Sequence, residues 1–306
     1  MPIARPATPG SSGSDRAPAT RRRSSSSSSS ELSTHGRRGG LSGAREGVPD
    51  PEPRFRARVE YDGTDFAGFQ VNPGKRTVQG ELEAALARLG DGGRIPIDGA
   101  GRTDAGVHAA DQVIAFTYGG RLSGGRLERA LNALLPRDVA IRDVRRVPAG
   151  WQPRRAARYR EYRYTVWNGP RSPLRERLAL GVRNPLDDAA MARAGSVLVG
   201  RHDFSAFGAR DRDPVRTVYA VRVRRTGRLV TMDVRADSFL RGMVRRIVAV
   251  LIEVGHGTVD ETAVAAALAG REPALAGASA PAQGLSLRHV ALGRAARASI
   301  GAHGER

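Results

Sequence analysis

The stretch GAGRTDAGVHA, residues 99–109, holds a single carboxylate, Asp104, in a glycine-rich loop. A carboxylate in such a loop can act as a nucleophile, move a proton or cap a turn. A phosphate-binding loop is disfavoured, because there is neither a Walker lysine nor a set of glycines that opens a helix. The flanking arginines oppose a metal site built from Asp104, His108 and Asp111, and no second carboxylate suits a glycosidase pair. The loop alone leaves a reactive aspartate and a turn-capping aspartate as alternatives.

The charge of the chain indicates the kind of partner to expect. The 306 residues include 50 basic and 31 acidic ones, a net charge of +19 at pH 7, and Lys75 is the only lysine. This excess favours a polyanion, because contacts with phosphates release counterions and steer the encounter. Nucleic acid is the leading candidate and an anionic membrane surface the weaker one. Residues 1–52 hold 8 basic and 5 acidic residues, so most of the excess belongs to the rest of the chain.

Cysteine is absent from the chain, which excludes disulfides, thiolate zinc ligands and a cysteine nucleophile. The sequence has no apolar run near the length of about 18 residues that a membrane span requires, and no secretory signal. We therefore expect a cytoplasmic protein. The arginine and serine near the N-terminus would also suit an organelle transit peptide, but that segment has no amphipathic helical pattern.

The elements that position the loop follow from hydrophobic periodicity. Residues 1–52 have few aliphatic side chains and a run of seven serines, which predicts a disordered tail. A helix is predicted between Thr77, its N-cap, and Gly90, its stop. Alternating and helical patterns predict the other elements of this half, which are strands over 55–61, 112–117 and 138–147 and a helix over 124–134.

A comparable order of elements recurs in the second half. It comprises a strand over 160–168, a helix over 185–200, a hairpin turning at Gly227, a helix over 239–255 and a strand over 284–292. We expect an α+β protein with one half over 53–150, a second over 151–293 and a tail over 294–306. No residue-level repeat relates the two halves.

The motifs along the chain carry a family resemblance. GAGRTDAGVHA closely resembles the active-site loop of the tRNA pseudouridine synthase A family. VEYDGTDFAGFQ, TVQGELEAAL, LNALLPRDVAI, REYRYTVWN, DFSAF, ADSFLRGMVRRIVAVLIEVG and APAQGLSL resemble its other blocks, in the same order and from about residue 54 to 292. Two positions depart from the pattern: Phe69 stands where a Trp is common, and Arg241-Gly242 where a second basic residue or His is common.

The resemblance implies a fold and a set of site residues. The fold is the pseudouridine synthase fold, in which two similar α/β halves form a mixed, largely antiparallel sheet flanked by helices with a central basic cleft. Asp104 is the essential nucleophile, attacking either C6 of uracil or C1′ of the ribose. Arg245 is expected to pair with it, ideally in a bidentate manner. Tyr162 stacks on the target base and assists with the C5 proton, Leu285 packs against the uracil, and Arg102 holds RNA around the flipped nucleotide.

The resemblance also implies a substrate. The family acts as a homodimer on uridines at tRNA positions 38, 39 and 40 in the anticodon stem-loop, without a cofactor or a metal. His108 is expected to order the loop rather than react. Two alternatives stay open: a synthase that modifies other RNA uridines, and a relative that binds RNA without modifying it. The joint presence of Asp104, Tyr162 and Arg245 favours an enzyme.

Overall fold

The computed structural model describes residues 52–270 and 277–293. The predicted tails, 1–52 and 294–306, lie outside the described residues except for Glu52. The strands are β1 (Arg54–Tyr61), β2 (Asp98–Gly99), β3 (His108–Thr117), β4 (Val139–Val147), β5 (Ala157–Asn168), β6 (Leu180–Val182), β7 (Gly200–Asp203), β8 (Val215–Thr226), β9 (Leu229–Ala236) and β10 (Leu285–Leu292). The helices are α1 (Val78–Leu89), α2 (Gly124–Leu134), α3 (Pro153–Ala156), α4 (Asp188–Val197), α5 (Met243–Gly255) and α6 (Glu261–Leu268), with short 3-10 turns η1 (Ser205–Phe207) and η2 (Ala282–Gly284).

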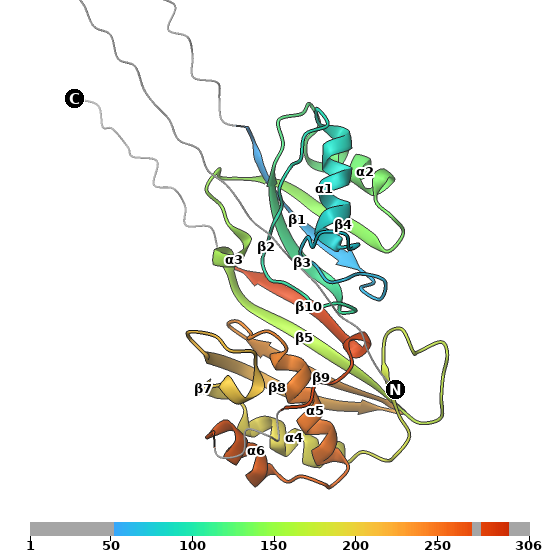
Figure 1. The fold of residues 1–306 in the computed structure, drawn as a ribbon, viewed down its shortest axis with the longest axis vertical. Coiled ribbons are helices and arrows are strands. Elements are labelled where there is room, and N and C mark those ends of the chain that lie inside the picture. Colours follow the sequence, from blue (N-terminus) through green and yellow to red (C-terminus); the bar gives the residue numbers. More distant parts are fainter. Residues whose placement is uncertain (1–51, 271–276, 294–306) are drawn as a thin grey trace, which may run out of the picture. The chain divides into compact units, whose positions relative to one another are not determined.

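The strands form one mixed sheet (Figure 1). Its order is β4-β1-β3-β10-β5-β9-β8-β7, with β2 beside β3 and β6 beside β5. Neighbouring strands are antiparallel except for the pairs β3 with β10 and β5 with β6. The last strand, β10, therefore lies between β3 and β5. The single sheet with its helices confirms the expected α+β class and the mixed, largely antiparallel sheet.

Several local predictions are confirmed. Thr77 caps α1 by accepting a hydrogen bond from the amide of Gly80, and Gly90 is its C-cap. Helix α2 has the predicted bounds. The hairpin of β8 and β9 turns at Gly227, whose φ of 57° favours glycine.

Other boundaries differ from the predictions. Strand β3 begins at His108, four residues earlier than expected, because its start pairs with β10 and is buried on both faces, which hides the alternation. Helix α5 begins at Met243 rather than 239, because Gly242 takes a left-handed conformation with φ 77° just before it. Helices α3 and α6 and strands β6 and β7 were not predicted. No helix of the described residues is long and apolar enough to cross a membrane.

The two faces of the sheet differ in chemistry. Along one face, apolar side chains pack beneath the helices, and a row of paired residues crosses from one half to the other: Tyr61, Ala109, Leu287, Tyr162 and Val234. The opposite face, called the charged face below, carries Arg56, Arg58, Glu60, Asp111, Arg142, Asp143, Glu161, Arg163, Asp233, Arg235 and His289.

Candidate active site

Asp104 lies in the loop that joins β2 to β3. Hydrogen bonds from the end of β1 and from the segment 66–69 hold this loop. The hydroxyls of Tyr61 and Thr103 are hydrogen-bonded to each other at 2.7 Å. The carbonyl oxygen of Thr103 also accepts a hydrogen bond from the amide of Phe69 at 3.1 Å. The amide of Gly106, whose φ is 76°, donates to the carbonyl of Phe66. The loop backbone is thus fixed, while the side chain of Asp104 stays 37% exposed.

The segment at Gly68 and Phe69 packs against the Asp104 loop. Gly68 has a φ of 98°, and a β-carbon there would lie 3.0 Å from the carbonyl oxygen of Thr103. Phe69 is 3% exposed, and its ring centroid lies 6.4 Å from that of Tyr61. Phe69 therefore fills an aromatic packing position.

Arg245, in the first turn of α5, faces Asp104 from the second half of the chain. Its Nη1 lies 3.8 Å from Oδ2 of Asp104, and its side chain is 25% exposed. The expectation of a bidentate pair is wrong for this structure. The Nε of Arg245 donates to the carbonyl of Ala280 at 2.7 Å, which turns the guanidinium so that one nitrogen faces the carboxylate. Opposite charges from the two halves still meet here.

Tyr162 lies on β5, beneath this pair of charges. It is 9% exposed, and the ring of Phe239 packs edge-on against it with centroids 5.2 Å apart. Burial raises the pKa of Tyr162 to about 12; the nearby Asp104 carboxylate adds to this rise and the Arg160 guanidinium opposes it. The phenol is therefore neutral at pH 7.

Leu285 and Arg102 occupy contrasting environments. Leu285 is 5% exposed at the start of β10, where it pairs with Tyr164 of β5 on the helix-covered face. Arg102 is exposed, and its side chain makes no ion pair within the described part of the chain. Leu285 is therefore an apolar packing residue, whereas Arg102 is an exposed cation.

His108 orders the loop, as expected. The amide of Gly63 donates to its Nδ1 at 3.0 Å, and its Nε2 lies 3.1 Å from the carbonyl oxygen of Gln283. Nδ1 also lies 3.1 Å from Oδ1 of Asp62, so both ring nitrogens have partners. His108 thereby ties the end of the catalytic loop to η2.

A family model described as tRNA pseudouridine synthase matches residues 57–154 and 194–291. The chain belongs to the tRNA pseudouridine synthase family. It is accordingly an isomerase, and the matched segments contain the Asp104 loop and Arg245.

Curated relatives match the synthase over nearly their whole length. It is 44% identical over 241 residues to the tRNA pseudouridine synthase A of Brevibacillus brevis, which covers 78% of this chain and 98% of that protein. It is 43% identical over 243 residues to the enzyme of the same name from Myxococcus xanthus, covering 78% and 91%. A solved Cbf5-Nop10-Gar1 complex matches with a TM-score of 0.27 at 13% identity over 65% of this chain and 54% of that one, a likeness too weak to support a conclusion.

Sequence reasoning missed three residues of the synthase that shape the loop. Tyr61 reads in the sequence as an ordinary apolar strand residue. Gln112 is a fully buried amide whose Nε2 donates to the carbonyl of Gly101 at 2.9 Å, and Arg160 donates to the carbonyl of Ala100 at 2.8 Å. The only available signal was a polar residue at a strand position that should be buried, and Gln112 and Arg160 both carry it.

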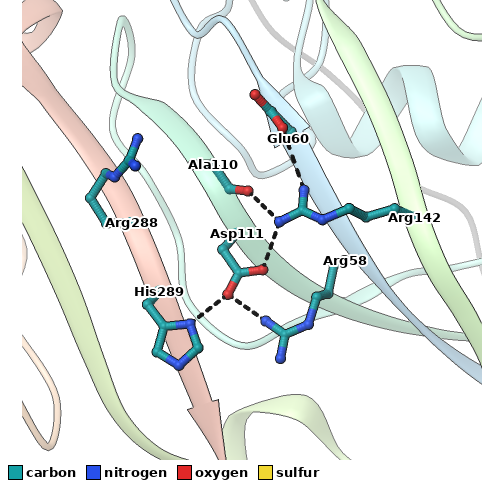
Figure 2. A pocket seen from close by; sticks show the side chains of 7 residues that line it. All are labelled: Arg58, Glu60, Ala110, Asp111, Arg142, Arg288 and His289. Carbon is teal, nitrogen blue, oxygen red and sulfur yellow. Dashed lines mark hydrogen bonds and ion pairs between the residues drawn. The ribbon is translucent and has the colours of Figure 1, made fainter.

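The synthase also has a hollow of about 550 Å³ on the charged face, away from Asp104 (Figure 2). Asp111 occupies it, accepting from Nη2 of Arg142 at 3.1 Å and contacting Nδ1 of His289 at 2.8 Å and the guanidinium of Arg58. Arg58 and Arg142 are thus engaged by the carboxylate of Asp111, whereas Arg288, which also lines the hollow, makes no contact with it. Its lining does not include Asp104, Tyr162 or Arg245.

Proposed function

We propose that this synthase converts uridine to pseudouridine at tRNA positions 38, 39 and 40 in the anticodon stem-loop, with Asp104 as the nucleophile. One observation carries the proposal: an accessible carboxylate on a fixed loop faces Arg245 at 3.8 Å, beside the buried ring of Tyr162. A nucleophile, a cation that directs it and an aromatic platform for a base are the groups that this isomerisation needs.

The reaction is balanced without any external reagent. The bond from N1 to C1′ breaks, the base turns, and a bond from C5 to C1′ forms, after which C5 loses a proton and N1 gains one. Asp104 starts this by adding to C6 or by trapping C1′ as an ester, and is released at the end. Substrate and product are isomers, so the scheme requires neither oxidant nor group donor.

The remaining residues receive roles that fit their surroundings. The ring of Tyr162 stacks on the target base, and its neutral hydroxyl serves as a hydrogen-bonding group that assists with the C5 proton. The phenolate is not the resting form, because burial raises the pKa to about 12. Leu285 offers an apolar surface to the uracil, and the exposed Arg102 grips RNA beside the flipped nucleotide in a basic cleft between the halves.

We further propose that the synthase works as a homodimer in the cytoplasm, organised as a half over 53–150 and a half over 151–293. The charged face could receive a second copy of the chain, because many of its charges are paired with one another. Nε of Arg163 lies 2.7 Å from Oδ1 of Asp233, and Nε of Arg235 lies 2.7 Å from Oε2 of Glu161. A surface whose arginines are largely neutralised attracts a polyanion more weakly than one with unpaired arginines.

The test is to map pseudouridine in tRNA from cells with the gene, without it, and with the Asp104→Asn variant. We expect positions 38, 39 and 40 to lose pseudouridine in the second and third strains, because an amide keeps the shape of the carboxylate but is not a nucleophile. Loss at other RNA positions would favour the alternative of a different uridine target. Unchanged pseudouridine in both strains would favour an RNA-binding relative without activity.

A further inference from the structure

Arg160 is a buried cation on β5, two residues before Tyr162. It is 9% exposed, and no acidic side chain of residues 52–270 or 277–293 lies within ion-pair distance of it. Burial lowers the pKa of its guanidinium from the ordinary value. A buried cation is unfavourable unless hydrogen bonds compensate for its lost hydration. The presence of a buried guanidinium at this position therefore needs a physical explanation.

Three backbone carbonyls supply that compensation. Nη1 of Arg160 donates to the carbonyl of Asp237 at 2.7 Å, and Nη2 donates to the carbonyls of Ala100 at 2.8 Å and Arg154 at 3.1 Å. The three carbonyls belong to segments that are distant in sequence. A planar guanidinium can reach all three at once because its donors are fixed in different directions.

The first segment leads into the catalytic loop. Ala100 lies four residues before Asp104, and its own amide donates to the carbonyl of Val113 at 2.8 Å. The loop is therefore anchored to the first half through its amide and to the second half through Arg160.

The second segment leads into α5. Asp237 begins the turn that contains Phe239, whose ring packs against Tyr162, and that ends at the helix bearing Arg245. The third segment, α3, precedes β5 itself. The guanidinium of Arg160 thus contacts both the segment that leads to Asp104 and the segment that leads to Arg245.

The sheet itself joins the halves weakly beside the site. Strand β10 pairs with β3 at only two residue pairs, Ser286 with His108 and Leu287 with Ala109. The loop that holds Asp104 lies beyond this short ladder. A further contact between the halves at the loop therefore has a large effect on where the carboxylate stands relative to α5.

We infer that Arg160 is a positioning residue that sets the gap between Asp104 and Arg245 by fixing the catalytic loop and the turn before α5 to one guanidinium. This inference rests on the proposed role of Asp104. Arg160 does not touch the substrate in this scheme, since its donors are occupied by carbonyls. Its removal should slow the chemical step without weakening tRNA binding, because a displacement near 1 Å can cost about 100-fold in rate.

The experiment compares Arg160→Ala and Arg160→Lys with a matched control, Arg225→Ala. Arg225 is also partly buried and ties separate segments together, with Nε 2.6 Å from Oδ1 of Asp188 and Nη2 2.7 Å from the carbonyl oxygen of Leu186, but it contacts neither loop of the site. For each variant we would measure the single-turnover rate at saturating enzyme, the tRNA dissociation constant and the melting temperature, with and without millimolar methylguanidinium.

We expect both alanine variants to melt at lower temperature, and only Arg160→Ala to lose rate, by about 10- to 100-fold, with tRNA affinity within about threefold of the parent. Methylguanidinium should restore part of the rate of Arg160→Ala and none in Arg225→Ala. Should Arg160→Ala fail to fold, Arg160→Lys decides the question. It keeps the charge but not the fork, so its rate should fall about tenfold.

A folded Arg160→Ala or Arg160→Lys protein that keeps the parent rate would overturn the inference. So would a loss of rate that equals the loss in Arg225→Ala and does not respond to methylguanidinium. Asp104→Asn, measured in parallel, separates the two hypotheses. If it is active, the proposed function fails; if it is inactive while the Arg160 variants are fully active, only the positioning role fails.

Discussion

At the scale of single residues, the contact between Asp104 and Arg245 matters for the orientation of the carboxylate rather than for the stability of the fold. Both side chains are partly exposed, at 37% and 25%, and ion pairs of this kind contribute little to folding. The same contact becomes stronger once a base covers it and excludes water. A nucleophile that is held loosely in the free protein can thus be aimed in the complex.

The variants Arg245→Leu and Arg102→Ala should distinguish the orientation of the Asp104 carboxylate from the binding of tRNA. Arg245→Leu should lower the single-turnover rate at saturating enzyme by about 10- to 100-fold with little change in tRNA affinity, because the carboxylate loses its direction. Arg102→Ala should weaken tRNA binding by about 1–2 kcal/mol and reduce the salt dependence of binding, because a phosphate contact is lost. If both variants lost only affinity, Arg245 would be a phosphate contact and not a partner of Asp104.

Tyr162→Phe should change how stability depends on alkaline pH. Burial raises the pKa of Tyr162 to about 12 in the folded protein, whereas the same phenol in the unfolded chain has the ordinary tyrosine pKa of 10.0. The neutral phenol therefore stabilises the fold fully below pH 10, and this contribution is lost as the pH rises towards 12. The phenylalanine variant cannot ionise, so between pH 9 and 11 its free energy of unfolding in urea should fall less, by about 1 kcal/mol. Parallel curves for the two proteins would show that the phenol titrates normally.

At the scale of elements, what the sequence predicted well was local. The Thr77 cap, the bounds of α2 and the turn at Gly227 depend on neighbouring residues, and each was found where expected. The start of β3 was missed because it pairs with β10, the last strand of the chain, and is buried there, so that its sequence does not alternate. Asp104 was found through a motif, whereas Arg160 was missed, because its carbonyl partners come from segments that only the fold brings together.

Gly68→Ala tests the support that one loop gives another. The substitution strains a backbone at φ 98° and puts a β-carbon 3.0 Å from the carbonyl oxygen of Thr103, so it should push the catalytic loop away. We expect a loss of about 1–3 kcal/mol in unfolding free energy and a clear fall in single-turnover rate. The control is Gly92→Ala, where φ is 81° and nothing lies within 4 Å of the added carbon. This control should lose stability and keep its rate; an equal loss of rate in both variants would contradict a specific role for Gly68.

At the scale of the whole molecule, the active site is a product of the sheet order. Asp104 belongs to the first half and Arg245 to the second, and they meet because β10, the last strand, lies between β3 and β5. Periodicity in the sequence predicted two α+β halves but carried no information on this insertion, since the strand order depends on pairing between distant segments. Tyr162, which is close to Asp104, lies on the helix-covered face, and the charged face lies on the opposite side of the sheet.

The last prediction concerns residues 1–50, which should be dispensable. Every proposed site residue lies between 102 and 285, and the described residues complete their own sheet and core. Residues 1–52 contribute 8 basic and 5 acidic side chains, so they add little to a net charge of +19. A chain without residues 1–50 should therefore keep its melting temperature and its single-turnover rate on tRNA at physiological salt. Any difference should be a small loss of tRNA affinity that is visible at low salt and screened near 0.15 M, where the Debye length is about 8 Å. A truncated chain that is insoluble, or that loses its rate at physiological salt, would show that these residues take part in folding or catalysis.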